Sequence, residues 1–190
     1  MAIRKIAQIG HPVLRTPARP VTHDELAGGA VQRLIDDLVD TMRDAGGAGI
    51  AANQVYEPVR ICTIEVDRNP RYPYKPPIPL TVLVNPVLEP IGEEMFDLNE
   101  GCLSVPLRGD LQRRLRVRVT AWDRYGDTVV HEVAGLTAGT FQHEIDHLDG
   151  MLYIDRVTDS RTLTTWQEFD RHRGQAFAAE MAAFVERIGS

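Results

Sequence analysis

The chain has 190 residues, of which 43% are hydrophobic and 25% are charged, and its formal net charge is −6. These values are typical of a single globular domain spanning 1–190, and the acidic balance argues against nucleic acid as the main partner. No apolar run approaches the ~20 residues needed to cross a bilayer, and the N-terminus lacks an apolar core long enough for a secretory signal. We therefore expect no nucleic-acid specificity and no membrane association.

The first predicted helix follows a capping box that runs from Thr22 to Glu25. Apolar residues then recur at helical spacing, and the pattern ends at Gly46 and Gly47. The apolar positions are Val31, Leu34, Ile35, Leu38, Val39 and Met42. They predict an amphipathic helix whose apolar face belongs to the core.

Four β-prone runs follow, at residues 59–66, 81–88, 115–122 and 128–133. The proline-rich segment 69–79 between the first two is predicted to be a surface loop, and 123–127 a hairpin turn. Four arginines near the third run are interpreted as a solvated strand face: Arg113, Arg114, Arg116 and Arg118.

The chain contains two cysteines, which are too few for the disulfide framework of a small secreted protein. We therefore expect a reducing, cytoplasmic environment. Cys62 lies in a β-prone run between Ile61 and Ile64, which predicts a core position. The other cysteine, Cys102, lies in a different setting, the segment Glu100-Gly101-Cys102-Leu103-Ser104.

The most informative segment is Gln142–His147, within a helix predicted to run from about Thr137 to Gly150. Two histidines four residues apart lie on one helical face, so His143 and His147 can bind one metal ion. Glu144 is then placed to exchange protons with water at that ion. The apolar stripe of this helix lies on the opposite side, at Phe141, Ile145 and Leu148.

Such a site needs a third protein ligand, and three sources are open. A metzincin-type extension fits as far as Gly150 but has Tyr153 where the third histidine belongs. A thermolysin-type glutamate would be Glu168, in which case the protein is an endopeptidase. A cysteine ligand would be Cys102. A third reading, from a different class, is a metal-binding or ribosome-associated protein whose site is inactive.

Beyond the metal helix, a last helix is predicted to begin at Asp159 or Ser160, with Gly174 as a kink. Residues 159–190 are therefore expected to form a C-terminal helical extension. Its second half carries an apolar stripe of Phe177, Met181, Phe184 and Val185, which suggests a docking surface.

Three motifs occur together in this chain: Gly47 to Val55, the EGCLS segment at 100–104, and QHEIDHLDG at 142–150. In this order they resemble the peptide deformylases, metalloenzymes that remove the formyl group from N-terminal formylmethionine. The chain departs from the family in having Ile50 where leucine is more frequent, and in a segment after Pro106 that is one residue shorter than in many members.

The resemblance implies an α+β fold in which antiparallel or mixed β-sheets pack around a central metal-binding helix, with an N-terminal amphipathic helix and a C-terminal helix. It implies that Cys102, His143 and His147 bind the metal and that Glu144 transfers protons. The side-chain amide of Gln54 and the backbone N–H of Leu103 would stabilise the oxyanion. The inactive reading is weakened because all these groups are present together.

The resemblance also implies a peptide-binding groove, in which main-chain hydrogen bonds hold the substrate and one pocket receives its first side chain. The expected substrate-binding residues are Gly47, Gly49, Ile50, Glu100, Gly101, Arg108, Leu136 and Gly139. The substrates would be N-formylmethionyl peptides.

One divalent metal per chain is implied, with Fe2+ as the ion in the cell and Zn2+, Ni2+ or Co2+ in the purified protein. The resemblance further implies a contact with the ribosome near its exit tunnel. The C-terminal helix would make that contact, although a helix simply docked on its own domain explains the same pattern.

Overall fold

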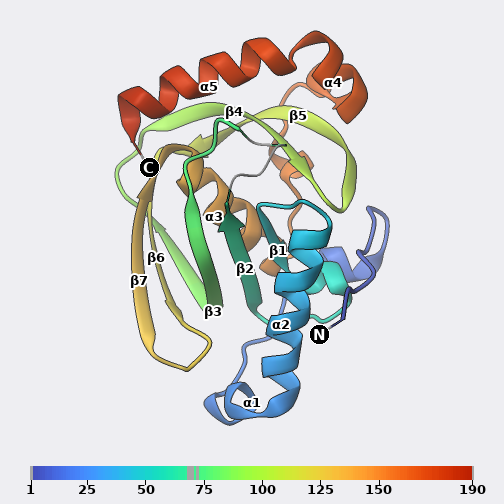
Figure 1. Cartoon of the computed structure of the whole chain (residues 1–190), viewed down its shortest axis with the longest axis vertical. Coiled ribbons are helices and arrows are strands. Elements are labelled where there is room, and N and C mark those ends of the chain that lie inside the picture. The colour runs from blue at the N-terminus through green and yellow to red at the C-terminus, as the bar shows by residue number, and fades with distance from the viewer. Residues whose placement is uncertain (1, 68–70, 72, 190) are drawn as a thin grey trace.

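The computed structural model describes residues 2–67, 71 and 73–189, and within them two antiparallel sheets and a set of helices (Figure 1). The larger sheet has the order β1-β2-β3-β6-β7 and the smaller one the order β4-β5-β8. The strands of the larger sheet are β1 (Gly49–Ala51), β2 (Ile61–Val66), β3 (Ile78–Pro90), β6 (Arg116–Trp122) and β7 (Thr128–Ala134). Those of the smaller sheet are β4 (Met95–Cys102), β5 (Val105–Arg114) and β8 (Thr164–Thr165). The predicted α+β class is confirmed.

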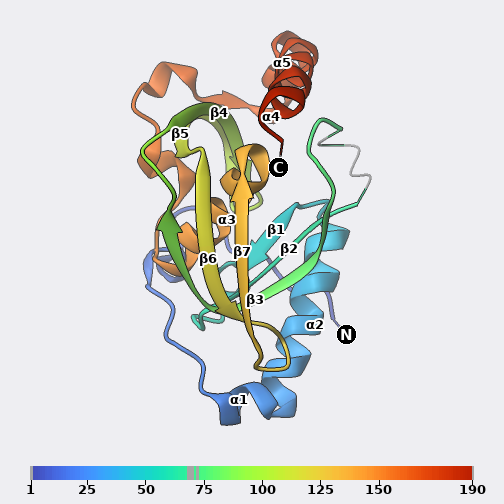
Figure 2. The same ribbon diagram turned by 90° about the vertical axis from the view of Figure 1, so that its left-hand side faces the viewer.

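The two faces of the larger sheet pack against different helices (Figures 1 and 2). Because side chains alternate along a strand, Ile61 points towards α2 (Gly29–Asp44) while Cys62 points towards α3 (Gly135–Leu148). Cys62 is fully buried there, as predicted. Since α3 also contacts β5, it lies between the two sheets.

The predicted N-terminal helix is two helices. The capping box of Thr22 and Glu25 forms as expected, but it opens only the short helix α1 (His23–Ala27). Gly28 then adopts an extended conformation and serves as the N-cap of α2. The apolar face of α2 is buried as predicted, with Leu38 at 0% exposure. The break arises at Gly28, where a Cβ would lie 3.1 Å from the backbone oxygen of Glu25, closer than most side chains tolerate.

The four predicted strand runs correspond to β2, β3, β6 and β7, with ends that differ by up to three residues. The hairpin β4–β5 was not predicted. Its strands pair along their length, from Met95 opposite Arg114 to Cys102 opposite Val105. Polar residues such as Asn99 and Glu100 are buried in β4, so the strand lacks the apolar alternation that would reveal it.

The interpretation of the arginine run as a solvated strand face is wrong for Arg113, which is only 1% exposed. Its partners are buried carboxylates, which a local charge pattern cannot reveal. The interpretation holds for Arg118, which lies on the exposed face of β6 and pairs with Glu132 of β7 across the strands.

The predicted start of the C-terminal helix at Asp159 or Ser160 is wrong. A 3-10 turn, η4 (Ser160–Thr162), is followed by β8, and helix begins only at α4 (Trp166–His172). In place of the kink expected at Gly174, the helix breaks completely at Arg173, and α5 (Gly174–Ile188) then runs across the top of the molecule (Figure 1). Phe177 and Met181 of the predicted stripe are buried against the body of the protein.

The proline-rich segment lies partly outside the described residues, at 68–70 and 72. Of the rest, Ile78 and Pro79 belong to β3, so the predicted loop ends earlier than expected. Tyr74 packs edge-on against Phe177 of α5, with the ring centres 5.4 Å apart. Across the described parts of the chain, we find no helix with the length and apolar character that crossing a membrane requires.

Candidate metal centre

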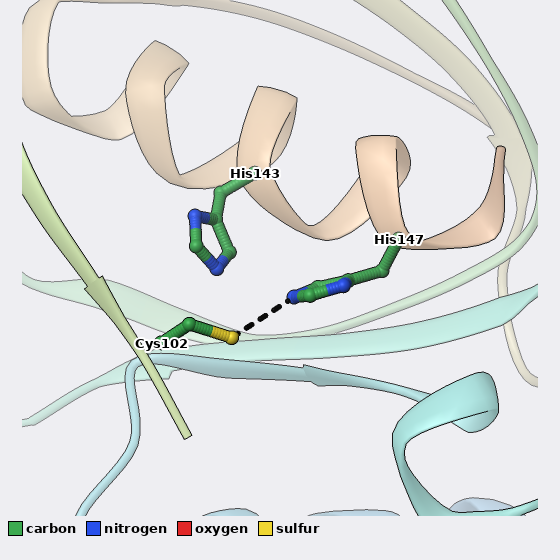
Figure 3. A group of neighbouring side chains, drawn as sticks. All are labelled: Cys102, His143 and His147. Atoms are coloured by element: carbon green, nitrogen blue, oxygen red, sulfur yellow. Dashed lines mark hydrogen bonds between the residues drawn. The ribbon is translucent and has the colours of Figure 1, made fainter. Parts of the chain in front are cut away.

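Three side chains from two elements form a group that could bind a metal ion. Cys102 ends β4, and His143 and His147 lie one turn apart on α3 (Figure 3). Their ligand atoms all lie within 4.8 Å of one another, and the Sγ of Cys102 is 3.3 Å from the Nε2 of His147. Cys102 therefore lies where it could serve as the third ligand.

The helix that carries both histidines begins at Gly135, two residues before the predicted start, and ends at Leu148. Gly135 and Gly150 have φ values of +55° and +76°, which glycine adopts without strain. Phe141 and Ile145 pack into the core beneath the larger sheet, on the side of the helix away from the histidines, as the periodicity predicted. The local sequence thus fixes which face of α3 carries the donors.

A buried charge network behind the donors fixes the orientation of His143. Glu100 lies 2.8 Å from the Nδ1 of His143 and receives two hydrogen bonds from Arg113, at 2.7 and 2.8 Å. Burial opposes ionisation of Glu100, but Arg113 and His143 outweigh it and hold the pKa of this carboxyl well below its ordinary value. With Nδ1 engaged by Glu100, the Nε2 of His143 is the atom left for a metal.

The same network continues to the second histidine's helix. Arg113 also donates to Asp146, which lies beside His147 in the sequence, and Arg156 donates to both oxygens of Asp146 at 2.7 and 2.6 Å. Burial lowers the pKa of His147 well below its ordinary value, which favours the neutral ring, the form that can bind a metal. The Nδ1 of His147 has no hydrogen-bond partner in the described part of the chain.

The donor set fits a divalent transition-metal ion, because a thiol and two imidazoles match the N and S ligands such ions take in catalytic sites. A backbone hydrogen bond also holds the sulfur in position, because the N–H of Ser104 donates to the Sγ of Cys102 at 3.3 Å. Ser104 was not predicted as a site residue; it lies in the EGCLS motif and could have been found there.

Glu144 is buried next to the donors, with 4% exposure. Burial raises the pKa of Glu144 to about 7, and its Oε2 has no hydrogen-bond partner among the described residues. Gly49 allows this placement, because a Cβ on Gly49 would lie 2.5 Å from the Oε1 of Glu144. Gly49, which was predicted to bind substrate, is thus also needed to leave room for the side chain of Glu144.

Gln54 lies in the 3-10 turn η2 (Ala52–Val55) and is held on both sides of its amide. Its Oε1 accepts from the backbone N–H of Ala51 at 2.9 Å, and its Nε2 lies 3.0 Å from the Oγ of Ser104 and 3.5 Å from the Sγ of Cys102. The NH2 group therefore faces the metal donors. Leu103 lies in the turn between β4 and β5, directly after Cys102.

These groups line one pocket of ≈ 600 Å³, including space open to solvent. The predicted residues that line it are Gly47, Gly49, Gln54, Glu100, Gly101, Cys102, Leu103, Arg108, Gly139, His143 and Glu144. Two other predicted substrate residues, Ile50 and Leu136, lie instead in buried core clusters, at 0% and 1% exposure.

The pocket also has a wall that the sequence did not reveal. Tyr74 and Lys75 of the proline-rich segment line it, and the Nζ of Lys75 lies 2.8 Å from the Oγ1 of Thr140 on α3. No local pattern marks these two residues in a segment rich in proline. Their position depends on where that segment crosses the fold.

Arg108 lines the pocket but is itself buried, at 3% exposure. It donates to the side chain and the backbone carbonyl of Asn99 at 2.8 and 3.0 Å. Its guanidinium lies 4.5 Å from the ring centre of Trp166 and 4.2 Å from that of Phe169. Arg108 is therefore held by β4 and by the C-terminal helices.

The endopeptidase reading receives no support from the position of Glu168. This residue is exposed on α4, where it interacts with His172 at 3.2 Å and with Arg171 at 3.7 Å. It is not part of the group of metal donors found among the described residues, whereas Cys102 is.

The comparison with protein families gives a match to the polypeptide deformylase model over residues 3–163. Peptide deformylase 1 of Prochlorococcus marinus is 40% identical and aligns over 100% of this chain and 94% of its own length. A peptide deformylase of Parafrankia is 46% identical over 83% of this chain and 80% of its own.

Solved structures agree. A class I type b peptide deformylase of Acinetobacter baumannii with bound Met-Ala-Ser matches with a TM-score of 0.79 and 37% identity, covering 82% of this chain and 99% of its own. A peptide deformylase of Synechococcus elongatus in complex with actinonin matches with a TM-score of 0.73 and 30% identity, over 95% of this chain and 94% of its own. The chain thus belongs to the polypeptide deformylase family, whose members remove the formyl group from N-formylmethionine peptides.

Proposed function

We propose that this chain hydrolyses N-formylmethionyl peptides to formate and a free amino terminus at the pocket lined by Cys102, His143 and Glu144. The observation that carries the proposal is that two of the three candidate metal donors line this pocket with a buried carboxylate, while the third, His147, has its ligand atom within 4.8 Å of the other two. Cys102, His143 and His147 would hold one divalent ion. When bound, that ion supplies Lewis-acid activation of water and of the formyl carbonyl.

Glu144 is the proton-transfer group in this proposal. Its Oε2, which has no hydrogen-bond partner among the described residues, would accept a proton from the attacking water and later deliver it to the leaving amine. Water adds to the formyl carbon, the C–N bond breaks, and the products are formate and the amine. Because Glu144 is buried beside Gly49, it is held in place for both transfers.

The oxyanion would be stabilised by the Nε2 of Gln54 and the backbone N–H of Leu103. The hydrogen bond from Ala51 to the Oε1 of Gln54 leaves the amide's donor end towards the metal donors. A positioned donor of this kind contributes about 3–4 kcal/mol to transition-state stabilisation in comparable sites.

Substrate binding would use the two strand edges that border the pocket. Among the described residues, β1 pairs only with β2 and β4 pairs only with β5, so each presents one free edge beside the pocket. An extended peptide can add to such edges through main-chain hydrogen bonds, which do not depend on sequence. Gly139 and Thr140, on α3 beside His143, would contribute to the pocket for the methionine side chain.

The test is formate release from a formylmethionyl dipeptide by the metal-loaded protein, with Glu144→Ala and Cys102→Ala as variants. We expect activity in the wild type, and a loss of more than about 100-fold in Glu144→Ala without loss of bound metal. Cys102→Ala should lose both metal and activity. No formate from freshly metallated wild-type protein would overturn the proposal, and full formate release by Cys102→Ala would contradict the role of Cys102 as a metal ligand.

We also infer that Fe2+ is the ion used in the cell, and that the protein acts in the cytoplasm on newly made chains, with a contact to the ribosome near its exit tunnel. A thiolate–iron site is sensitive to oxygen, so protein purified without air should be more active than protein purified in air. Elemental analysis of both preparations shows whether the difference in activity follows their iron content. Equal activity with zinc in each would contradict iron as the working metal.

A further inference from the structure

Trp166 lies just beyond residue 163, where the match to the family model ends, yet its ring lies against Gly101, which lines the metal pocket. Its position is fixed from both sides. The preceding strand β8 pairs with β5, with Thr165 opposite Leu107 and Thr164 opposite Arg108. Thr165 then caps α4 by accepting from the backbone N–H of Glu168. The indole is therefore held by backbone structure and not by a mobile tail.

The indole of Trp166 occupies the space that a side chain at Gly101 would need. A Cβ built on Gly101 would overlap three atoms of the six-membered ring of Trp166. Gly101 immediately precedes Cys102 on β4, and β4 has a free edge at this point among the described residues. The ring of Trp166 thus fills the space left by the absent side chain of Gly101, on one face of β4 beside the metal pocket.

A second pocket of ≈ 650 Å³, including open space, adjoins the first and has Trp166 in its wall. It shares Cys102 and Leu103 with the metal pocket, so the two lie side by side. Its other lining residues are Arg71, Val105, Pro106 and Asp170. Most of the wall is apolar, with one charge of each sign contributed by Arg71 and Asp170.

Residues directly opposite each other on adjacent strands place their side chains on the same face, where they touch. A substrate strand added to the free edge of β4 would therefore place the side chain opposite Gly101 on the face where a Gly101 side chain would lie, against the group that occupies that space. That neighbour is the indole of Trp166, and the adjoining pocket lies beside it.

We propose that Trp166 forms a wall of the subsite for the substrate residue that follows formylmethionine, and that this subsite selects apolar side chains. The inference rests on the proposed function and deepens it, because it makes the C-terminal segment part of the substrate-binding surface. Arg108 supports the indole, because its guanidinium lies 4.5 Å from the ring centre of Trp166 and 4.2 Å from that of Phe169.

The first test compares Trp166→Ala, Trp166→Phe and wild type on three substrates: formylmethioninamide, formyl-Met-Gly-Ser and formyl-Met-Leu-Ser. Wild type should prefer leucine over glycine in the second position. In Trp166→Ala we expect KM for formyl-Met-Leu-Ser to rise about five-fold, the size of one aromatic contact, so that the preference disappears. Trp166→Phe should restore part of it. Gln167→Ala, at the next and exposed position of α4, is the matched control and should behave as wild type.

An equal loss on all three substrates, or an unchanged leucine preference, would overturn the inference. In the first case Trp166 would serve only to support the fold. Thermal unfolding and metal content of each variant identify that outcome directly. A wild-type protein that releases no formate from any of the three would instead contradict the proposed function.

The second test uses the two tryptophans of the chain. Trp122 stacks on His23, with the ring centres 3.8 Å apart, and does not line either pocket. In a Trp122→Phe background, the emission of Trp166 should change and saturate on titration with the product Met-Leu-Ser, but not with methioninamide. No change with Met-Leu-Ser, or the same change with both ligands, would place the second residue elsewhere and overturn the inference.

Discussion

Two regions border the pocket, one built from buried ion pairs and the other from aromatic contacts. Behind the metal donors, Glu100, Arg113 and Asp146 form a buried network of ion pairs that orients His143. In the other region, Arg108 packs against the rings of Trp166 and Phe169 on α4. The first region is directional and fixes donor atoms. The second is an aromatic surface on the side where the proposed subsite lies.

This comparison predicts that damage to the network removes metal and stability, whereas damage to the aromatic side changes substrate binding. Arg113→Met gives the largest effect, because it leaves the buried carboxylate of Glu100 without its cation. We expect a loss of about 3 kcal/mol in the free energy of unfolding, at the low end for a broken buried pair because Asp146 keeps Arg156. Urea unfolding of the metal-free protein measures it. A loss below 1 kcal/mol would show that the network does not stabilise the fold.

Glu100→Gln tests the orienting role of the network without changing its size. The amide keeps a hydrogen bond to the Nδ1 of His143 but loses the charge that pairs with Arg113. Metal affinity should fall about 10- to 100-fold, as for other partners that orient a ligand histidine. Competition with a chelator of known affinity measures the change, and unaltered affinity would contradict the role given to Glu100.

Phe169→Leu tests the aromatic side. Phe169 is buried at 3% exposure and packs edge-on against Phe177. A conservative loss of ring contacts should reduce the free energy of unfolding by about 1 kcal/mol and raise KM for peptides longer than formylmethioninamide, with metal content unchanged. Loss of metal in this variant would mean that the two regions are not separate.

Arg118→Met is the control for the network, because it removes an arginine whose partner is exposed. Arg118 and Glu132 are 50% and 57% exposed at their side chains, so solvent and salt screen the pair. The free energy of unfolding should change by less than about 0.5 kcal/mol. If Arg118→Met lowered the free energy of unfolding as much as Arg113→Met, burial of the ion pair would not explain the effect of Arg113→Met.

The structure brings together the three residues that the sequence predicted as donors, Cys102, His143 and His147. The two histidines lie one helical turn apart whatever surrounds them, and the resemblance of the EGCLS segment to the family pointed to the cysteine. The amphipathic face of α2 was predicted for the same reason. The hairpin β4–β5 escaped prediction because its buried positions include Glu100 and Arg113, whose polarity is satisfied only by partners distant in the chain.

By itself, then, the sequence determined what is periodic or contiguous: the helical face of the two histidines, four strand cores and the family to which the motifs belong. Only the tertiary structure decided what depends on long-range contact. It buried Arg113, placed Tyr74 and Lys75 in the pocket wall, and laid Trp166 on Gly101. The physical reason is that a side chain's burial and partners are set by the chain that folds over it, which its neighbours in sequence do not encode.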